Sequence, residues 1–138
     1  MAALTQDRNT PERNADEFTF DMAAATTIFA GSLVALDASG NLVKGTTAVG
    51  LIAAGRAQES KTNSGAAGAE KLRVKKCAFR WANSSAADLI TKAEIGDDCY
   101  IVDDQTVAKT SASSTRSRAG RVVDVDALGV WVATGLGL

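Results

Sequence analysis

Residues 94–104, EIGDDCYIVDD, bring together five carboxylates and one cysteine, groups that could bind a divalent cation or exchange protons. The spacing of these groups argues against one shared site. The run CYIV between the two acidic pairs is typical of a buried strand, and four residues at about 3.3 Å each separate the pairs by more than about 13 Å. One calcium or magnesium ion cannot span that distance. We therefore interpret the aspartates as the ends of a strand and a turn, with a divalent ion at one pair as the alternative.

Other residue types that carry catalysis or bind metals are scarce. The sequence has no histidine, which excludes Ser-His-Asp and Cys-His catalysis and every imidazole metal site. Its two cysteines, Cys77 and Cys99, are too few for a structural zinc site, and both lie in apolar runs where we expect small core residues. The glycine-rich segment NSGAAGAEK lacks the Gly-Lys-Ser/Thr of a phosphate loop, and we expect a solvent loop there. No catalytic residue, cofactor or metal ligand is predicted.

The formal net charge of −1 provides no global field that would attract nucleic acid or an anionic membrane. The basic residues form two local groups, Lys71, Arg73, Lys75, Lys76 and Arg80, and then Arg116, Arg118 and Arg121. We expect the first group to pair across strands with the acidic residues 94–104, with nucleic-acid contact as the alternative. We expect the second group to be solvated or to contact a partner protein. We do not expect the start of the chain to be a signal peptide, because no apolar core follows a basic end. No apolar run approaches the roughly 18 residues of a membrane span.

Three segments read as a strand, a turn and a second strand, which predicts β-hairpins. In LVALDASGNLVKG, Asp37 can accept the turn amides and Gly40 can adopt a left-handed conformation. RVVDVDALGVWVATG repeats this arrangement with Asp126 and Gly129, and Asp103 marks the turn between CYIV and TVAKT. Three hairpins in 138 residues predict an all-β fold, a small antiparallel sandwich or barrel.

Two further segments have their own signals. The strand KLRVKKCAFRWA changes its apolar phase at Lys75–Lys76, which predicts a β-bulge or a strong twist. Residues 84–96 contain the only plausible short helix, two or three turns capped by Ser84 or Ser85 and stopped by Gly96. The side chains expected to pack in the core or between protomers are Phe79, Trp81 and Trp131. Aromatic residues make up only 5% of the chain, so we expect a thin core and oligomerisation.

The start of the chain differs in composition from the rest. Residues 1–17 hold the only proline, six charges and almost no large apolar side chain, so they cannot fold by themselves. The following FTFDM alternates apolar and polar residues, as a half-buried strand or one that waits for a partner would. We divide the chain into an extended arm, residues 1–25, and a β domain, residues 26–138. The alternative is a frayed terminus.

Three segments resemble the small cement, or decoration, proteins of tailed-bacteriophage capsids: GSLVALDASGNLVKGTTAVGLIAAGRA, ITKAEIGDDCYIVDDQTVAKT and AGRVVDVDALGVWV. The resemblance implies an all-β homotrimer, made in the host cytoplasm, that sits on the outer surface of the virion and clamps major capsid protein subunits. It also implies an N-terminal arm that reaches onto the shell. From the composition of the start and the alternation of FTFDM, we expect the arm to make its contacts through Arg8, Pro11, Arg13, Phe18, Phe20 and Met22. It carries over no active site, so we expect no enzyme, and the charge balance leads us to expect no nucleic-acid or membrane partner. The alternatives are a head-fibre base or tail component and a small metal-dependent enzyme.

Overall fold

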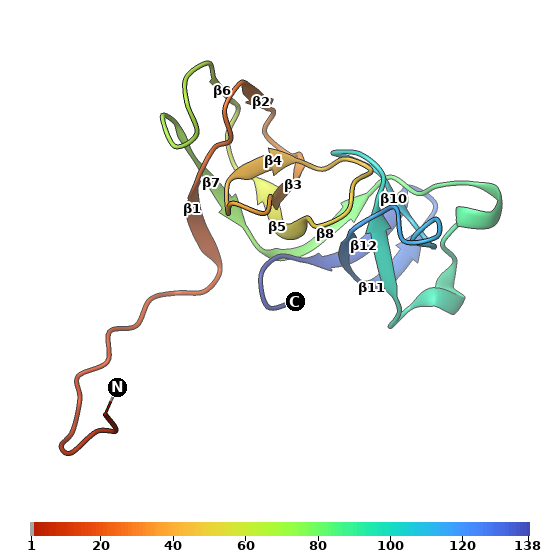
Figure 1. Cartoon of the computed structure of the whole chain (residues 1–138). Helices are drawn as coiled ribbons and strands as arrows, with labels where there is room; N and C mark the ends of the chain where they lie inside the picture. The colour runs from red at the N-terminus through yellow and green to blue at the C-terminus, as the bar shows by residue number, and fades with distance from the viewer. Residues whose placement is uncertain (1) are drawn as a thin grey trace.

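The computed structural model describes residues 2–138, in which twelve strands form three sheets and the helical segments are single turns (Figure 1). The predicted all-β class is confirmed, and in this part of the chain neither large sheet closes into a barrel. The first sheet has the order β1 (Glu17–Asp21), β7 (Lys71–Lys75), β5 (Ile52–Ala57), β3 (Leu33–Leu36), β4 (Leu42–Lys44). The second has the order β10 (Val107–Ala108), β9 (Asp98–Ile101), β11 (Arg118–Asp126), β12 (Gly129–Thr134), β8 (Cys77–Trp81). A third, two-stranded sheet pairs β2 (Thr26–Ile28) with β6 (Lys61–Asn63).

Strand β3 separates two apolar clusters. Its residues Leu33 and Ala35 pack with the second sheet, while Val34 packs on the other side with residues of β2, β4 and β7. A strand covered on both faces has no polar face to present, which explains the continuous apolar run LVAL. The first sheet is therefore the middle layer of the β body.

The phase change at Lys75–Lys76 marks a change of sheet. The chain leaves the first sheet at the end of β7 and enters the second as β8, with only Lys76 between the two strands. Leu72 of β7 and Phe79 of β8 can thus both be buried, each in a different cluster. The backbone is crowded here, because a side chain at Gly135 would collide with Lys76.

The short helix predicted for residues 84–96 is two separate 3₁₀ turns, η1 (Ala86–Asp88) and η2 (Lys92–Glu94). The extended link between the two turns carries Ile90 into the core, where its side chain is 1% exposed. In a continuous helix, Ile90 would instead lie on one side of the helix surface. Asn83 fixes this link by accepting the N–H of Ile90 at 3.0 Å and donating to its carbonyl at 2.8 Å. The predicted cap residues do not act as expected, because Ser85 makes no side-chain cap bond. Thr91 caps η2 instead.

The strand FTFDM has its partner within the chain. Its first four residues lie in β1, which pairs with β7 in the register Glu17 opposite Lys75 through Asp21 opposite Lys71. Met22, just after β1, is fully buried in the core. The structure therefore places residues 17–22 in the β body, and residues 2–15 extend away from it (Figure 1).

Candidate functional site

The acidic stretch that could have formed a metal site is divided between the two ends of β9. At one end Asp98 accepts the Arg118 Nε–H at 2.8 Å, and at the other Asp103 accepts the Gln105 N–H at 2.9 Å. Glu94 closes a capping box with Thr91, whose backbone N–H holds the pKa of this carboxyl below its usual range. Among residues 2–138, no group of three or more His, Cys, Asp or Glu side chains is placed to hold a metal ion.

The residues predicted to shape turns hydrogen-bond within them. Asp37 accepts the N–H groups of Ser39 and Asn41 at 2.9 and 3.0 Å, and Gly40 has the left-handed φ of 79°. At the second hairpin Asp126 accepts the N–H groups of Leu128 and Gly129. Gly129 is needed for a second reason, since a side chain there would collide with the carbonyl of Trp81 on β8.

The three aromatic side chains predicted for packing occupy different environments. Trp81 is 5% exposed and donates its indole N–H to Thr134 at 3.1 Å. Phe79 is also buried, and the guanidinium of Arg56 lies 4.6 Å from its ring centroid. Trp131 is half-buried on the same sheet, with Arg80 over its ring at 5.6 Å. Trp81 and Phe79 are thus core residues of the single chain, and Trp131 keeps an accessible face.

The basic residues of β7 pair with β1 and with Glu59 in the link between β5 and β6, which corrects their predicted pairing with residues 94–104. Lys71 pairs with Asp21, and Arg73 reaches Glu17 at 3.4 Å and Glu59 at 3.1 Å. The backbone N–H of Arg73 is the largest cause of the lowered pKa of Glu59. These ion pairs align the β1 edge strand on β7.

Of the arginines at residues 116–121, Arg116 and Arg118 are hydrogen-bonded within the chain, whereas Arg121 is exposed to solvent as expected. Arg116 donates to Asp88 at 3.2 Å, and that carboxylate also accepts the Thr110 hydroxyl at 2.6 Å. This hydroxyl is the largest cause of the lowered pKa of Asp88. Arg118 and Arg121 both lie beside Asp98, at 2.8 and 4.0 Å.

The two cysteines differ in environment, and one prediction was wrong. Cys99 is fully buried as expected, and burial raises the pKa of its thiol to about 12. Cys77 is exposed, because it begins β8 directly after the change of sheet.

The N-terminal segment, residues 2–16, is exposed along its whole length and includes Arg8 and Pro11 (Figure 1). It is tied to the body near its end, where the guanidinium of Arg13 lies 5.2 Å from the ring centroid of Phe18. Phe18 and Phe20 are half-buried neighbours on β1 with ring centroids 6.0 Å apart. Of the six residues predicted to contact a partner, Arg8, Pro11 and Arg13 are thus accessible, and Met22 is not.

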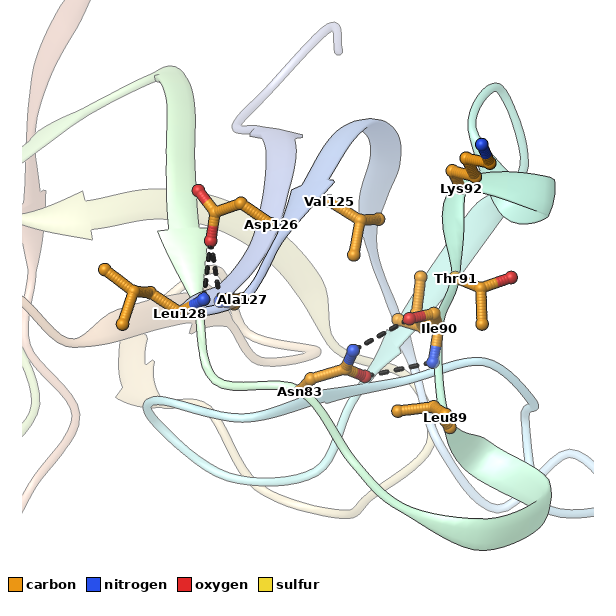
Figure 2. A pocket seen from close by; sticks show the side chains of 10 residues that line it. Asn83, Leu89, Ile90, Thr91, Lys92, Val125, Asp126, Ala127 and Leu128 are labelled. Carbon is orange, nitrogen blue, oxygen red and sulfur yellow. Dashed lines mark hydrogen bonds between the residues drawn. The ribbon is translucent and has the colours of Figure 1, made fainter.

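A hollow of about 580 Å³ lies between the 3₁₀ segment and the β11–β12 hairpin (Figure 2). Its exposed apolar side chains include Leu89 and Leu128, and Val125 points into it. The polar groups of Asn83 and Asp126 at its edge are engaged with the backbone. The arrangement offers an apolar surface with few free polar groups. This hollow is not evident from the sequence, because its lining residues have the local signals of a short helix and a turn.

The role of Asn63 is likewise not evident from its local sequence. It is fully buried, and its side-chain amide donates to the carbonyls of Met22, Ala23 and Ala66 at 3.0–3.2 Å. Its carbonyl oxygen accepts the N–H of Gly65 at 3.0 Å. One side chain thus joins the end of β1 to the glycine-rich loop, which is otherwise largely exposed. An asparagine before Ser-Gly was the available signal, although it did not reveal the distant partners.

Comparisons with family models, curated proteins and solved structures found no match. In the described part of the chain, no helix is long and apolar enough to cross a membrane.

Proposed function

We propose that this chain is a structural virion protein, a decoration protein that binds the outside of a bacteriophage head as a homotrimer and stabilises contacts between major capsid protein subunits. The observation that carries the proposal is the exposed segment of residues 2–16, which leads away from a folded β body. The three segments that resemble cement proteins support it. They span β3 to β5, η2 to β10, and β11 to β12, which include seven of the twelve strands.

The physics of the exposed segment fits attachment to a larger surface. An extended chain can add as a strand to a sheet edge of a partner, with backbone hydrogen bonds supplying affinity. Ordering such a chain costs roughly 1–2 kcal/mol per residue, so one arm alone binds weakly. Three arms on one trimer recover this loss, because the second and third contacts are effectively intramolecular.

Cosedimentation with phage heads that lack the protein tests the proposal. The heads come from the phage whose genome encodes this chain, and bound protein is quantified per capsid subunit. We expect saturable binding, and light scattering of the free or bound-and-released protein should give three chains. If the protein stays in the supernatant even when it is added at saturating concentration, head decoration would be contradicted. Binding to isolated tails instead would assign the protein to another part of the virion.

A further inference from the structure

The outer edge of β8 has a gap in its hydrogen bonding. This strand pairs with β12 on one side only, and alternate residues of a strand direct their backbone groups to opposite edges. The N–H of Lys76 donates to the Asp16 carbonyl at 2.9 Å, and the N–H of Ala82 donates to the Gln105 carbonyl at 2.8 Å. The backbone N–H and C=O groups of the even-numbered residues of this segment therefore point away from β12. At both ends of the outer edge these groups already have hydrogen-bond partners.

Between those ends lie Ala78 and Arg80, which share the same parity. Both residues are exposed, and in residues 2–138 no strand pairs with them from the outer side. Their two N–H and two C=O groups form a short open edge, a feature to which an extended segment can add.

The strand that approaches this edge stops just before it. The antiparallel pairing of β1 with β7 reaches Glu17 opposite Lys75, and the next pair, Asp16 and Lys76, is only half formed. The carbonyl of Asp16 accepts the Lys76 N–H, but the N–H of Asp16 donates to its neighbour Asn14 at Oδ1, 3.1 Å away. Local side-chain bonds of asparagine compete with strand pairing. Asn14 thus ends the ladder at this point.

We propose that the open edge of β8 is a strand-binding site for residues 12–15 of the same chain, and that Asn14 controls its occupancy. Continuing the β1–β7 register places Asn14 opposite Ala78 and Glu12 opposite Arg80. The second pair joins opposite charges, which favours pairing across strands. Pro11 fits the end of the added strand. As an odd-numbered residue in this register, it directs its backbone nitrogen, which carries no hydrogen, away from β8, and an edge strand tolerates proline at such a position.

The N-terminal segment then has two positions. In the free position, seen in this structure, residues 2–15 extend from the body. In the added position residues 12–15 cover the β8 edge, which shields its unpaired groups from other chains. The direct connection to β1 gives the segment a high effective concentration at this edge. The inference concerns the isolated chain and does not depend on the partner proposed above.

Engineered disulfides test the register. In a Cys77→Ser background, which removes the exposed thiol, Glu12→Cys and Arg80→Cys are combined, and the matched control combines Arg8→Cys with Arg80→Cys. The effective concentration of each thiol pair is measured in glutathione buffers by peptide mass mapping. We expect at least a tenfold higher value for position 12 than for position 8, because only the former lies opposite Arg80. Equal values would overturn the proposed register.

Substitution of Asn14 tests its role as the stop. Asn14→Ala removes the acceptor for the Asp16 N–H, whereas Asn14→Asp keeps one. We expect Asn14→Ala to raise the effective concentration of the 12–80 pair at least threefold and Asn14→Asp to leave it within twofold. In the chain without engineered cysteines, Asn14→Ala should slow hydrogen exchange at the Ala78 and Arg80 amides, and deletion of residues 2–14 should accelerate it. Unchanged exchange in both variants would overturn the inference.

Discussion

The indole N–H of Trp131 donates to the carboxylate of Asp126 at 2.9 Å, across the hairpin that the same carboxylate closes. Asp126 also accepts the backbone N–H groups of Leu128 and Gly129 at 2.7 and 3.0 Å, and Arg80 lies 3.7 Å away. The pKa of Asp126 is lowered by these contacts, first of all by the Trp131 hydrogen bond. One ionised group therefore fixes both the turn and the position of the tryptophan on β12.

Asp126→Asn should destabilise the protein in a pH-dependent way. The folded-state pKa lies below the ordinary value of 3.8, so the carboxylate stabilises the folded state above that pH. This stabilisation is lost as the pH falls through the folded pKa. We expect wild type to be more stable than Asp126→Asn at neutral pH, with the difference narrowing below pH 3.8. Urea denaturation across this pH range measures it. Asp104→Asn is the control, since its side chain makes no comparable turn bonds, and a constant difference at all pH values would refute the linkage.

The two tryptophans should differ in their contribution to stability. Trp81→Ala removes a side chain that is 5% exposed and leaves the Thr134 hydroxyl without its donor, so we expect a loss of about 3–5 kcal/mol. Trp131→Ala should cost less than about 2 kcal/mol, because Trp131 is only half-buried. Denaturation of the dilute protein measures both. If Trp131→Ala costs as much as Trp81→Ala, its accessible face is covered by another protomer.

The hairpins were predictable because their signals are local. Asp37 and Gly40 interact within one turn, and the apolar runs around them are long enough to identify both strands. The 3₁₀ turns were not, since the short helix expected from the sequence is interrupted by Ile90, whose burial depends on distant strands.

Candidate contacts were harder to predict than strands, for the same physical reason. Phe20 and Met22 have the alternation of a strand that needs a partner, but the pattern cannot say whether that partner is β7 or another chain. The ion pairs of Arg73 depend on which strands become neighbours, as does the role of Asn63. Pairing across the fold is set by the whole topology, which no short segment encodes.

Replacement of Asn63 should lower the stability of the β body, although Asn63 lies next to an exposed loop. Asn63→Ala leaves the Ala23 carbonyl without its donor and the Gly65 N–H without its acceptor, and we expect a loss of about 1–3 kcal/mol. The carbonyls of Met22 and Ala66 keep backbone donors. Asn63→Asp should be worse at neutral pH, because a carboxylate would face those carbonyl oxygens. Thermal unfolding measures the loss. Ser64→Ala, in the exposed loop beside it, is the control and should change little; equal stability of all three variants would contradict this role.

The loop before β11 contains three consecutive residues in the left-handed region, Ala112, Ser113 and Ser114, with φ of 50°, 60° and 65°. This conformation costs a non-glycine residue about 1–2 kcal/mol. A glycine avoids that cost, but its greater freedom in the unfolded chain destabilises the folded state by about 0.4–1 kcal/mol. Ser113→Gly should therefore stabilise the protein by about 0.5–1 kcal/mol. Thr115→Gly, at a position without positive φ, should destabilise it. Chemical denaturation of both variants compares them, and destabilisation by Ser113→Gly would contradict the loop conformation.

Two truncations should separate folding from attachment. Deletion of residues 1–14 leaves the Asp16–Lys76 bond, all of β1 and the buried Met22 in place, so stability should change by less than about 0.5 kcal/mol. Deletion of residues 1–22 removes an edge strand and the fully buried Met22, and should cost more than about 3 kcal/mol.

If the exposed segment attaches the protein to phage heads, the shorter deletion should yield a folded protein that no longer sediments with them. Arg8→Ala, which changes one side chain of the segment, should retain most binding. Full occupancy of heads by the folded 1–14 deletion would show that the β body carries the attachment site.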